Sequence, residues 1–339
     1  MRNDEIEVVA EALGRRVVAT STLAGGFSHE TCLVTLDQGR VVVRLGGSDP
    51  AIEAAVMATA RALVPVPAVL LVLPSQQTKP SSETTTGGDA EPGSGTGPAG
   101  QDEQAAEQTR PAMVLEYVAG TPLSEVLEEG GPQLAELGAE VGRVAAGIAA
   151  VSFDRPGFFV DAALSTHPQP PWSKQLAEFA ESCMTATPDA RLEREARRAW
   201  AALCAEHAPA LEPIDDHARL AHADLNPKNI LVTRTAAGWR VDAVLDWEFS
   251  YASSPYGDAA NMARFGADYP PGFLDGFAAA FAEHQPADLP LVDDWAYRGR
   301  LLDMFALSDL VTRGLGHPVA DRAAVEIRRW LADGIPRTL

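Results

Sequence analysis

The sequence predicts an α+β fold of two lobes, a small β-rich lobe at the N-terminus and a larger helical lobe at the C-terminus. About the first hundred residues alternate between helical and strand patterns, and the chain from Thr121 onward is mostly helical. One pair of short strands interrupts these later helices. With 339 residues, of which 46% are hydrophobic, the chain can fill a sizeable core.

The N-terminal lobe is expected to begin with a helix, followed by a hairpin. Apolar residues recur at helical spacing before Gly14, which ends the helix; they are Ile6, Val9, Ala10 and Leu13. Two β-branched runs, 33–36 and 41–45, flank the polar stretch 37–40. This short link contains a glycine and therefore predicts a hairpin turn.

A second helix and two further strands complete the predicted lobe. Apolar residues recur at helical spacing over 51–63, and Pro65 and Pro67 then end the helix. Strands are expected over 68–73 and 112–117.

Between these two strands lies a low-complexity insertion, residues 74–111, rich in Ser, Thr, Gly, Pro and Gln. It has almost no large apolar side chains, so burial cannot repay its ordering entropy. We expect a mobile loop that joins two neighbouring strands, although a linker between independent domains is an alternative. The predicted division is an N-terminal lobe over 1–117 and a C-terminal lobe over 118–339.

The C-terminal lobe is predicted to consist of helices around one β-hairpin. The hairpin combines strands over 230–233 and 240–245 with a link containing Gly238. Helices are expected over 123–127, 133–150, 172–184, 191–207, 271–283, 292–313 and 322–331.

Charge argues against several classes of protein. Against 27 Lys and Arg residues stand 47 Asp and Glu residues, and the formal net charge is -20. The long-range field would repel nucleic acid and anionic membranes, so we expect neither as a partner. The same charge favours a cationic small molecule, or it serves only to keep the protein in solution.

The sequence also indicates a soluble, cytoplasmic protein. No apolar run approaches the roughly 18 residues that span a bilayer, and the acidic N-terminus MRNDEIEVVAEALG lacks an apolar signal segment. Cys32, Cys183 and Cys204 are odd in number and widely spaced, without a disulfide or metal-ligand pattern. The sequence does not indicate an oligomeric state.

The segment HADLNPKN, residues 222–229, carries the most specific chemistry of the chain. An aspartate followed five positions later by an asparagine suits phosphoryl transfer, in which one side chain orients a hydroxyl and another holds a metal. Asp246 ends the second strand of the predicted hairpin, which would bring it back beside the loop. Asp224 would then orient the attacking hydroxyl, and Asn229 and Asp246 would bind Mg²⁺ bridging the phosphates.

The other residues of this loop are expected to shape it. His222 would support the loop backbone through hydrogen bonds rather than act as a base. Asn226 and Pro227 suit the turn.

These motifs resemble the catalytic loop and metal motif of the aminoglycoside phosphotransferase and choline kinase superfamily. The resemblance rests on His222-Ala223-Asp224, on Asn229 and on the LDWE sequence at 245–248. The family usually has His-Gly-Asp where this chain has Ala223, which replaces one small residue by another. Residues 256–261 resemble its Gly-Asp-Pro segment, whose aspartate supports the lobe. The resemblance implies a bilobal protein-kinase-like fold and Mg²⁺-dependent transfer of the γ-phosphoryl group of ATP or GTP. It also implies that residues 1–117 form a nucleotide-binding lobe and residues 118–339 a catalytic and acceptor-binding lobe.

The resemblance also implies roles in the N-terminal lobe. Gly25, Gly26 and Ser28 would form a turn whose N–H groups and hydroxyl meet the phosphates. Arg44 corresponds to the basic residue that reaches the α and β phosphates, and Glu53 to its ion-pair partner. Lysine is usual in place of Arg44, and the guanidinium fork differs in geometry from an ammonium.

Nucleotide and acceptor contacts follow from the same resemblance. Residues 112–120 resemble the strand and hinge that hold adenine through backbone atoms of Glu116 and Val118. The acceptor pocket would come mostly from the helical lobe, over 172–207 and 271–315. There, several aspartates could meet an amine and several aromatic rings could pack on an apolar group: Asp268, Asp275, Asp293, Asp294, Asp303 and Asp309, and Trp295, Tyr297 and Phe305.

We therefore expect a small-molecule O-phosphotransferase that acts on a hydroxylated, antibiotic-like acceptor such as an aminoglycoside, a macrolide or a cationic peptide, and so confers resistance. Three alternatives stay open: a metabolic kinase for choline, homoserine, a ketosamine or a sugar; a pseudokinase that binds nucleotide without turnover; and a metal-dependent hydrolase. Asp224, Asn229 and Asp246 argue against the pseudokinase, whereas Arg44 leaves room for it.

Overall fold

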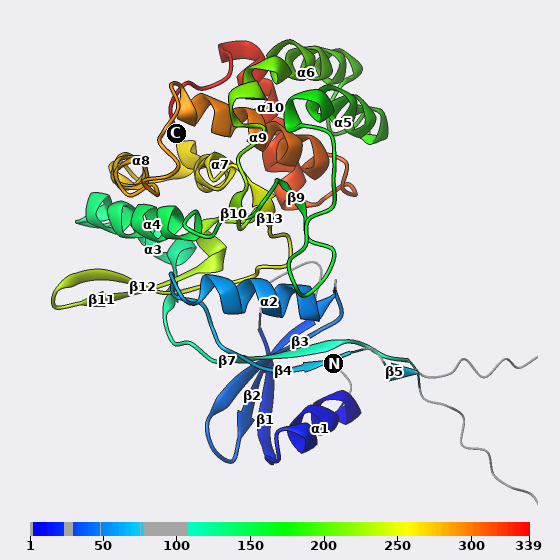
Figure 1. Ribbon diagram of the computed structural model, residues 1–339, viewed down its shortest axis with the longest axis vertical. Helices are drawn as coiled ribbons and strands as arrows, with labels where there is room; N and C mark the ends of the chain where they lie inside the picture. The colour runs from blue at the N-terminus through cyan, green and yellow to red at the C-terminus, as the bar shows by residue number, and fades with distance from the viewer. Residues whose placement is uncertain (1–2, 24–29, 48, 75, 78–107) are drawn as a thin grey trace, which may run out of the picture. The chain divides into compact units, whose positions relative to one another are not determined.

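The computed structural model describes residues 3–23, 30–47, 49–74, 76–77 and 108–339 (Figure 1). The chain divides into two compact units, residues 1–50 with 70–115, and residues 51–69 with 116–339. Residues 51–69 lie within the predicted N-terminal lobe but group with the second unit.

The first unit is built on a five-stranded sheet with the order β1-β2-β3-β7-β4. Its strands are β1 (Val17–Thr22), β2 (Glu30–Leu36), β3 (Arg40–Leu45), β4 (Val69–Leu73) and β7 (Ala112–Glu116). Helix α1 (Asn3–Ala12) shares one buried core with the sheet, because Ile6 and Val9 pack with Val34, Val43 and Val114.

The predicted hairpin is present in this unit. Strands β2 and β3 pair antiparallel, with Leu33 opposite Val42. Gly39 has a φ of 87° in the turn, a conformation that glycine adopts without strain, and the N–H of Leu36 donates to its carbonyl at 3.0 Å.

Strands β4 and β7, which flank the insertion, are neighbours in the sheet. Beyond them, β5 (Gln76–Gln77) and β6 (Gln108–Thr109) continue as an antiparallel pair, with Gln77 opposite Gln108. The insertion therefore joins neighbouring strands, as the sequence predicts. The predicted mobility of its central part concerns residues 78–107, which lie outside the described residues.

The second unit is mainly helical, as predicted. Its helices are α2 (Pro50–Ala60), α3 (Leu123–Glu129), α4 (Leu134–Ile148), α5 (Trp172–Ala186), α6 (Arg194–His207), α7 (Tyr256–Ala263), α8 (Phe273–Glu283), α9 (Trp295–Leu310) and α10 (Pro318–Asp333), with short 3₁₀ turns at Ala208–Ile214, Pro227–Asn229 and Gly266–Asp268. No helix in the described part of the chain is both long and apolar enough to cross a membrane.

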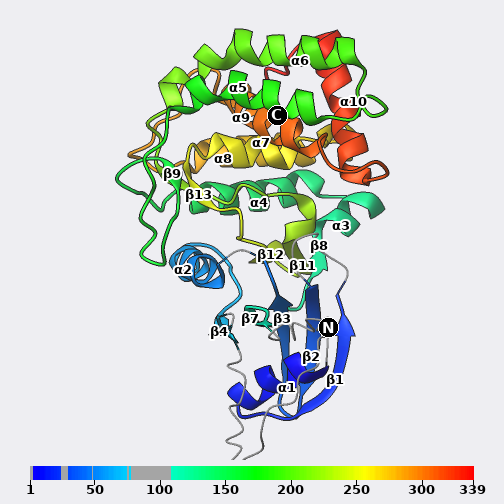
Figure 2. The same cartoon turned by 90° about the vertical axis from the view of Figure 1, so that its right-hand side faces the viewer.

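Helices α4 and α8 lie side by side in this unit (Figures 1 and 2). Small residues allow their backbones to approach closely. A Cβ atom at Gly138 would lie 2.0 Å from the carbonyl oxygen of Phe273, and one at Gly276 would lie 2.0 Å from that of Ala135. This contact is possible only with glycine at both positions.

Two small sheets flank the loop formed by residues 222–229. One has the order β12-β11-β8, from β8 (Thr121–Pro122), β11 (Ile230–Thr235) and β12 (Gly238–Val244), and contains the predicted hairpin. The other has the order β10-β13-β9, from β9 (Gly157–Phe158), β10 (Arg219–Ala221) and β13 (Tyr251–Ser253). The sequence did not predict this second sheet, because strands of two or three residues carry no readable alternation.

Candidate active site

Residues 222–229 link β10 to β11 and form the loop at the centre of the site. The hairpin returns the chain to the loop, because Ile230 pairs with Val244 and the N–H of Leu245 donates to the carbonyl of Asn229 at 2.8 Å. Asp246 therefore follows directly after a residue that is bonded to the loop. This is the approach that the sequence predicts for the two motifs.

His222 holds the loop from inside. It is fully buried, and its ring lies 4.6 Å from the ring of Trp247. Its Nδ1 accepts the N–H of Asp224 at 3.2 Å, so its Nε2–H donates to the carbonyl of Leu245 at 2.8 Å. Burial lowers the pKa of His222 and keeps the ring neutral. Because both ring nitrogens are engaged, the geometry favours the expected supporting role over that of a base.

Ala223 occupies a backbone conformation that non-glycine residues rarely adopt, with a φ of 67°. The buried carboxylate of Asp258 accepts the N–H of His222 and the N–H of Ala223, each at 2.8 Å. Nδ2 of Asn261 donates to the carbonyl of Ala223 at 2.9 Å. Helix α7, which carries both partners, thus fixes the turn immediately before Asp224.

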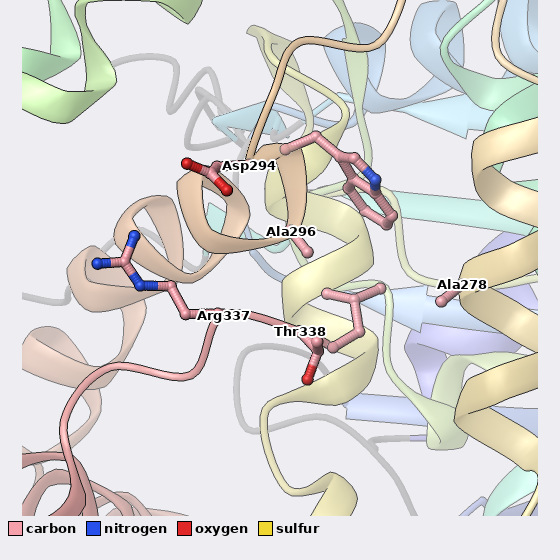
Figure 3. A pocket seen from close by; sticks show the side chains of 7 residues that line it. Ala278, Asp294, Ala296, Arg337 and Thr338 are labelled. Carbon is pink, nitrogen blue, oxygen red and sulfur yellow. The ribbon is translucent and has the colours of Figure 1, made fainter.

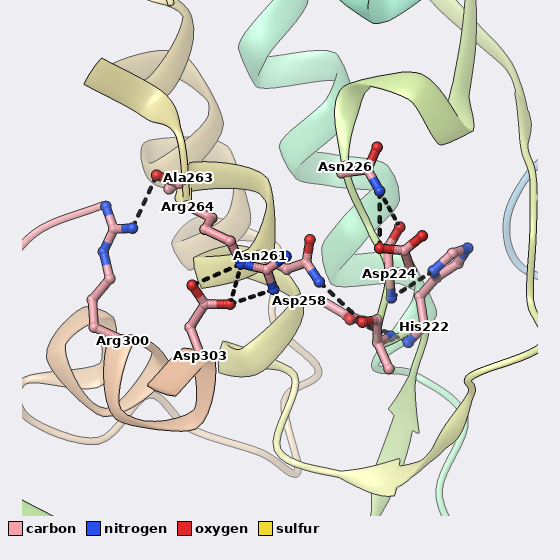
Figure 4. Close-up of polar contacts among 10 residues, drawn as sticks. His222, Asp224, Asn226, Asp258, Asn261, Ala263, Arg264, Arg300 and Asp303 are labelled. Carbon is pink, nitrogen blue, oxygen red and sulfur yellow. Dashed lines mark hydrogen bonds and ion pairs between the residues drawn. The ribbon is translucent and has the colours of Figure 1, made fainter. Parts of the chain in front are cut away.

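Two asparagines hold the carboxylate of Asp224, and Figure 4 shows one of them, Asn226. Nδ2 of Asn226 donates to Oδ1 at 3.0 Å, and Nδ2 of Asn229 donates to Oδ2 at 2.8 Å. The same two amides also reach the main-chain carbonyl of Asp224, at 3.1 and 2.9 Å. Each carboxylate oxygen can accept a second hydrogen bond, so the group stays able to bind a hydroxyl.

A buried ion pair lies beside this carboxylate. Nε and Nη2 of Arg264 donate to the carboxylate of Asp303 at 2.9 and 2.6 Å, and both side chains are buried. Figure 4 shows this pair on one side of Asn261 and Asp224 on the other. Burial raises the pKa of Asp224, and the positive charge of Arg264 opposes that shift.

Asp246 and Asn229 together offer ligands that suit Mg²⁺. Asp246 lies close enough to Asp224 to contribute, after burial, to its raised pKa. Because the amide nitrogen of Asn229 donates to Asp224, its amide oxygen lies on the opposite side of the group. Among the described residues, no three or more His, Cys, Asp or Glu side chains form a metal cluster. A two-residue oxygen site completed by phosphates is nevertheless the usual Mg²⁺ arrangement, so these residues fit the ion.

The same combination of loop, hairpin and supporting helix has a counterpart among known families. The model of the phosphotransferase enzyme family matches residues 20–295. The chain belongs to this family. It is therefore a phosphotransferase, a kinase with a hydroxyl group as acceptor. None of the curated protein sequences matches it significantly.

Solved structures share the protein-kinase-like fold of this phosphotransferase. A thermostable mutant of aminoglycoside phosphotransferase APH(4)-Ia, in a ternary complex with ADP and hygromycin B, superimposes with a TM-score of 0.65 at 16% identity, covering 97% of this chain and 98% of that one. The GDP complex of aminoglycoside 2'-phosphotransferase-IIIa gives 0.63 at 14% identity, with 98% and 99% covered. A microcompartment-associated aminopropanol kinase gives 0.56 at 16% identity, with 98% and 100% covered.

The phosphate-binding residues expected in the N-terminal lobe are described only in part. Gly25, Gly26 and Ser28 lie outside the described residues. Arg44 is buried on β3 of the first unit, and Glu53 is buried on α2. Their ion pair and their contact with phosphates stay predictions.

The predicted hinge residues of the phosphotransferase lie at the end of β7 and after it. The N–H of Glu116 donates to the carbonyl of Ala68 at 2.8 Å. Its carboxylate accepts the N–H of Ala68 at 3.0 Å and pairs with Arg61 at 3.4 Å. Val118 is half-buried in the connector that follows. The adenine contacts of Glu116 and Val118 stay predictions.

Sequence reasoning missed part of the network around Asp224. It gave Asn226 only a turn-forming role, and it did not connect Asn261 and Arg264 with the loop. A detectable signal was present: Asp258, Asn261 and Arg264 recur every three residues in a segment otherwise made mostly of small and apolar residues. This spacing puts polar groups on one face of a buried helix.

A separate cavity of about 310 Å³ lies between α8, the start of α9 and the C-terminal tail (Figure 3). Its lining includes Asp294, Trp295 and Arg337. It shares no residue with the hydrogen-bond network around Asp224, so we do not assign it to phosphoryl transfer.

Proposed function

We propose that this phosphotransferase moves the γ-phosphoryl group of ATP or GTP to a hydroxyl of a small antibiotic-like acceptor, with Asp224 as the catalytic residue. The observation that carries the proposal is the carboxylate of Asp224, held on both oxygens by Asn226 and Asn229 at 3.0 and 2.8 Å. A carboxylate fixed in this way can orient a hydroxyl before attack, because its remaining lone pairs have defined directions.

In the proposed reaction the acceptor oxygen forms a bond to the γ-phosphorus while the bond to the β–γ bridging oxygen breaks. The nucleoside diphosphate leaves, and the hydroxyl proton passes to Asp224. Mg²⁺ held by Asn229 and Asp246 would neutralise charge on the phosphate oxygens. Arg264 would limit the cost of the charge on Asp224, since it opposes the pKa rise that burial causes.

The antibiotic acceptor is supported by two structural neighbours. One is an aminoglycoside phosphotransferase in complex with hygromycin B, and the other is an aminoglycoside 2'-phosphotransferase. A metabolic acceptor is the second candidate, and the likeness to an aminopropanol kinase favours it. Both candidates require the same use of Asp224.

The test is mass spectrometry of hydroxylated antibiotics and metabolites incubated with the protein, Mg²⁺ and either ATP or GTP. We expect one acceptor to gain a single phosphoryl group. Asp224→Ala should lower the rate by about 100-fold or more, because positioning and proton transfer both depend on this carboxylate.

Glu212→Ala provides a control, since it removes an exposed carboxylate that pairs with Lys174 at 2.8 Å, outside the loop network. Transfer that continues within about tenfold in Asp224→Ala would contradict the catalytic assignment. Nucleotide binding without transfer to any acceptor would favour a pseudokinase.

A further inference from the structure

Five aromatic side chains of the second unit form a continuous cluster, here called the ring cluster. Phe158 lies 5.1 Å from Tyr251 and 5.9 Å from Trp172, measured between ring centroids. Trp172 lies 5.7 Å from Phe305, which in turn lies 5.3 Å from Phe179. The rings come from β9, β13, α5 and α9, so the fold assembles them from distant parts of the chain.

The ring cluster begins one strand away from the catalytic loop. In the sheet β10-β13-β9, Tyr251 pairs with Ala221 on one side and with Phe158 on the other. Ala221 immediately precedes His222 and the loop. Burial, followed by the nearby charge of Asp258, raises the pKa of the Tyr251 phenol, and Asp258 is the residue that holds the loop backbone. The ring cluster and the loop that carries Asp224 are therefore connected through neighbouring strands of one sheet.

Both ends of the ring cluster are open to solvent. Phe158 is 51% exposed and Phe179 is 38% exposed, whereas Trp172 between them is only 6% exposed. The indole Nε1–H of Trp172 is buried and has no acceptor among the described residues, and Nε2 of Gln169 shares this condition. Buried donors nearly always have a partner, so these two call for an acceptor from outside the protein chain, either an ordered water molecule or a bound small molecule.

Arginines neutralise part of the acidic charge that could meet an amine. Of the six aspartates considered for this contact, Asp268, Asp303 and Asp309 each pair with an arginine. Two of the three aromatic residues expected to contact an apolar acceptor lie outside the ring cluster. Tyr297 bonds His207 at 2.6 Å, and Trp295 packs 5.2 Å from Phe281. The third, Phe305, belongs to the ring cluster.

We propose that the ring cluster is the acceptor-binding surface of this phosphotransferase, and that the acceptor carries a flat or bulky apolar ring system beside the hydroxyl that is phosphorylated. The inference rests on the proposed function. Apolar rings stack against the exposed faces of Phe158 and Phe179, and a polar atom of the acceptor takes the free N–H of Trp172. A polycationic acceptor finds neither of these contacts.

The test uses the full-length protein and two hydroxylated probes, 2-naphthol and hygromycin B. The indole N–H resonance of Trp172 is assigned with Trp172→Phe and followed by NMR during each titration. We expect 2-naphthol to shift this resonance saturably and hygromycin B to leave it unchanged. Trp330 is the internal control, because its Nε1–H donates to buried Glu326 at 2.6 Å and should not respond.

Phe158→Ala should weaken 2-naphthol binding by about three- to tenfold, the loss expected for one ring contact. Phe158→Leu, which keeps an apolar side chain, should weaken 2-naphthol binding less than Phe158→Ala does. Val325→Ala, at a 65% exposed position on α10, should have no effect. An unshifted Trp172 resonance, or an unchanged Kd in Phe158→Ala, overturns the inference.

The two proposals fail in different ways. If the catalytic role of Asp224 is wrong, Asp224→Ala retains transfer whatever the probes do. If the ring cluster is not the acceptor surface, the resonance of Trp172 stays unshifted although Asp224-dependent transfer to some acceptor is measured. A shift caused by hygromycin B but not by 2-naphthol would also overturn the inference, because it would identify a polar acceptor.

Discussion

Ala223 has a strained backbone conformation that positions the residues on either side of it. Its φ of 67° turns the chain so that His222 points into the core while Asp224 meets Asn226 and Asn229. The left-handed conformation costs an alanine about 1 kcal/mol or more. The two hydrogen bonds that Asp258 accepts and the one that Asn261 donates maintain this conformation.

Replacing Ala223 by glycine should raise the free energy of unfolding by up to about 1 kcal/mol, because the strain relieved exceeds the extra chain entropy that glycine loses. Ala223→Val should lower it by about 2 kcal/mol or more, since a β-branched side chain fits this conformation poorly. Urea denaturation measures both. A stabilising valine, or a glycine variant that unfolds more easily, would contradict this account of the turn.

At the scale of elements, the close packing of α4 against α8 opposes ordinary helix propensity. Glycine inside a helix is about 1 kcal/mol less favourable than alanine. Here, however, a Cβ atom at Gly138 would meet the carbonyl oxygen of Phe273 at 2.0 Å, and one at Gly142 would meet that of Phe277 at 2.3 Å. Backbone atoms cannot move aside as a flexible side chain can, so packing decides the outcome.

Gly138→Ala should therefore lower the free energy of unfolding by about 2 kcal/mol or more, even though alanine favours the helix. Gly257→Ala is the matched control on α7, because its Cβ would meet only the side chain of Leu302, at 3.6 Å. This control should be neutral or stabilising by up to about 1 kcal/mol. Chemical denaturation measures the free energy of unfolding of both variants. Equal changes in the two variants would contradict the inference that the close contact of α4 with α8 excludes a Cβ atom at Gly138.

At the scale of the whole molecule, the insertion at residues 74–111 raises the question of whether stability and activity depend on it. Its two ends are tied together, because Gln77 and Gln108 oppose each other in an antiparallel pair. A two-residue Asn-Gly turn can join strands at such a position.

Replacing residues 78–107 by Asn-Gly should leave the melting temperature nearly unchanged, since long surface insertions contribute little to stability. The rate of phosphoryl transfer should stay within about twofold of that of the full-length protein. Calorimetry and the mass-spectrometric assay measure the two quantities. A large loss of turnover in a normally folded variant would instead assign the insertion a role in catalysis.

The sequence by itself determined the elements that have strong local patterns and the residues of the most specific motif. Long amphipathic helices and the hairpins 30–45 and 230–244 follow from periodicity and turn residues, which act over a few neighbouring positions. The loop 222–229 and Asp246 could be paired from sequence, because a hairpin returns its end to its start. The two-lobed α+β class followed from the order of these elements.

Only the tertiary structure decided which distant side chains complete the site. Asp258 and Asn261 come from α7, which reaches the loop across the fold, and the strain at Ala223 is visible only in the backbone. The ring cluster likewise joins four elements that are far apart in the sequence. Such contacts depend on how helices and strands pack, and packing is a property of the whole core rather than of any local stretch of chain.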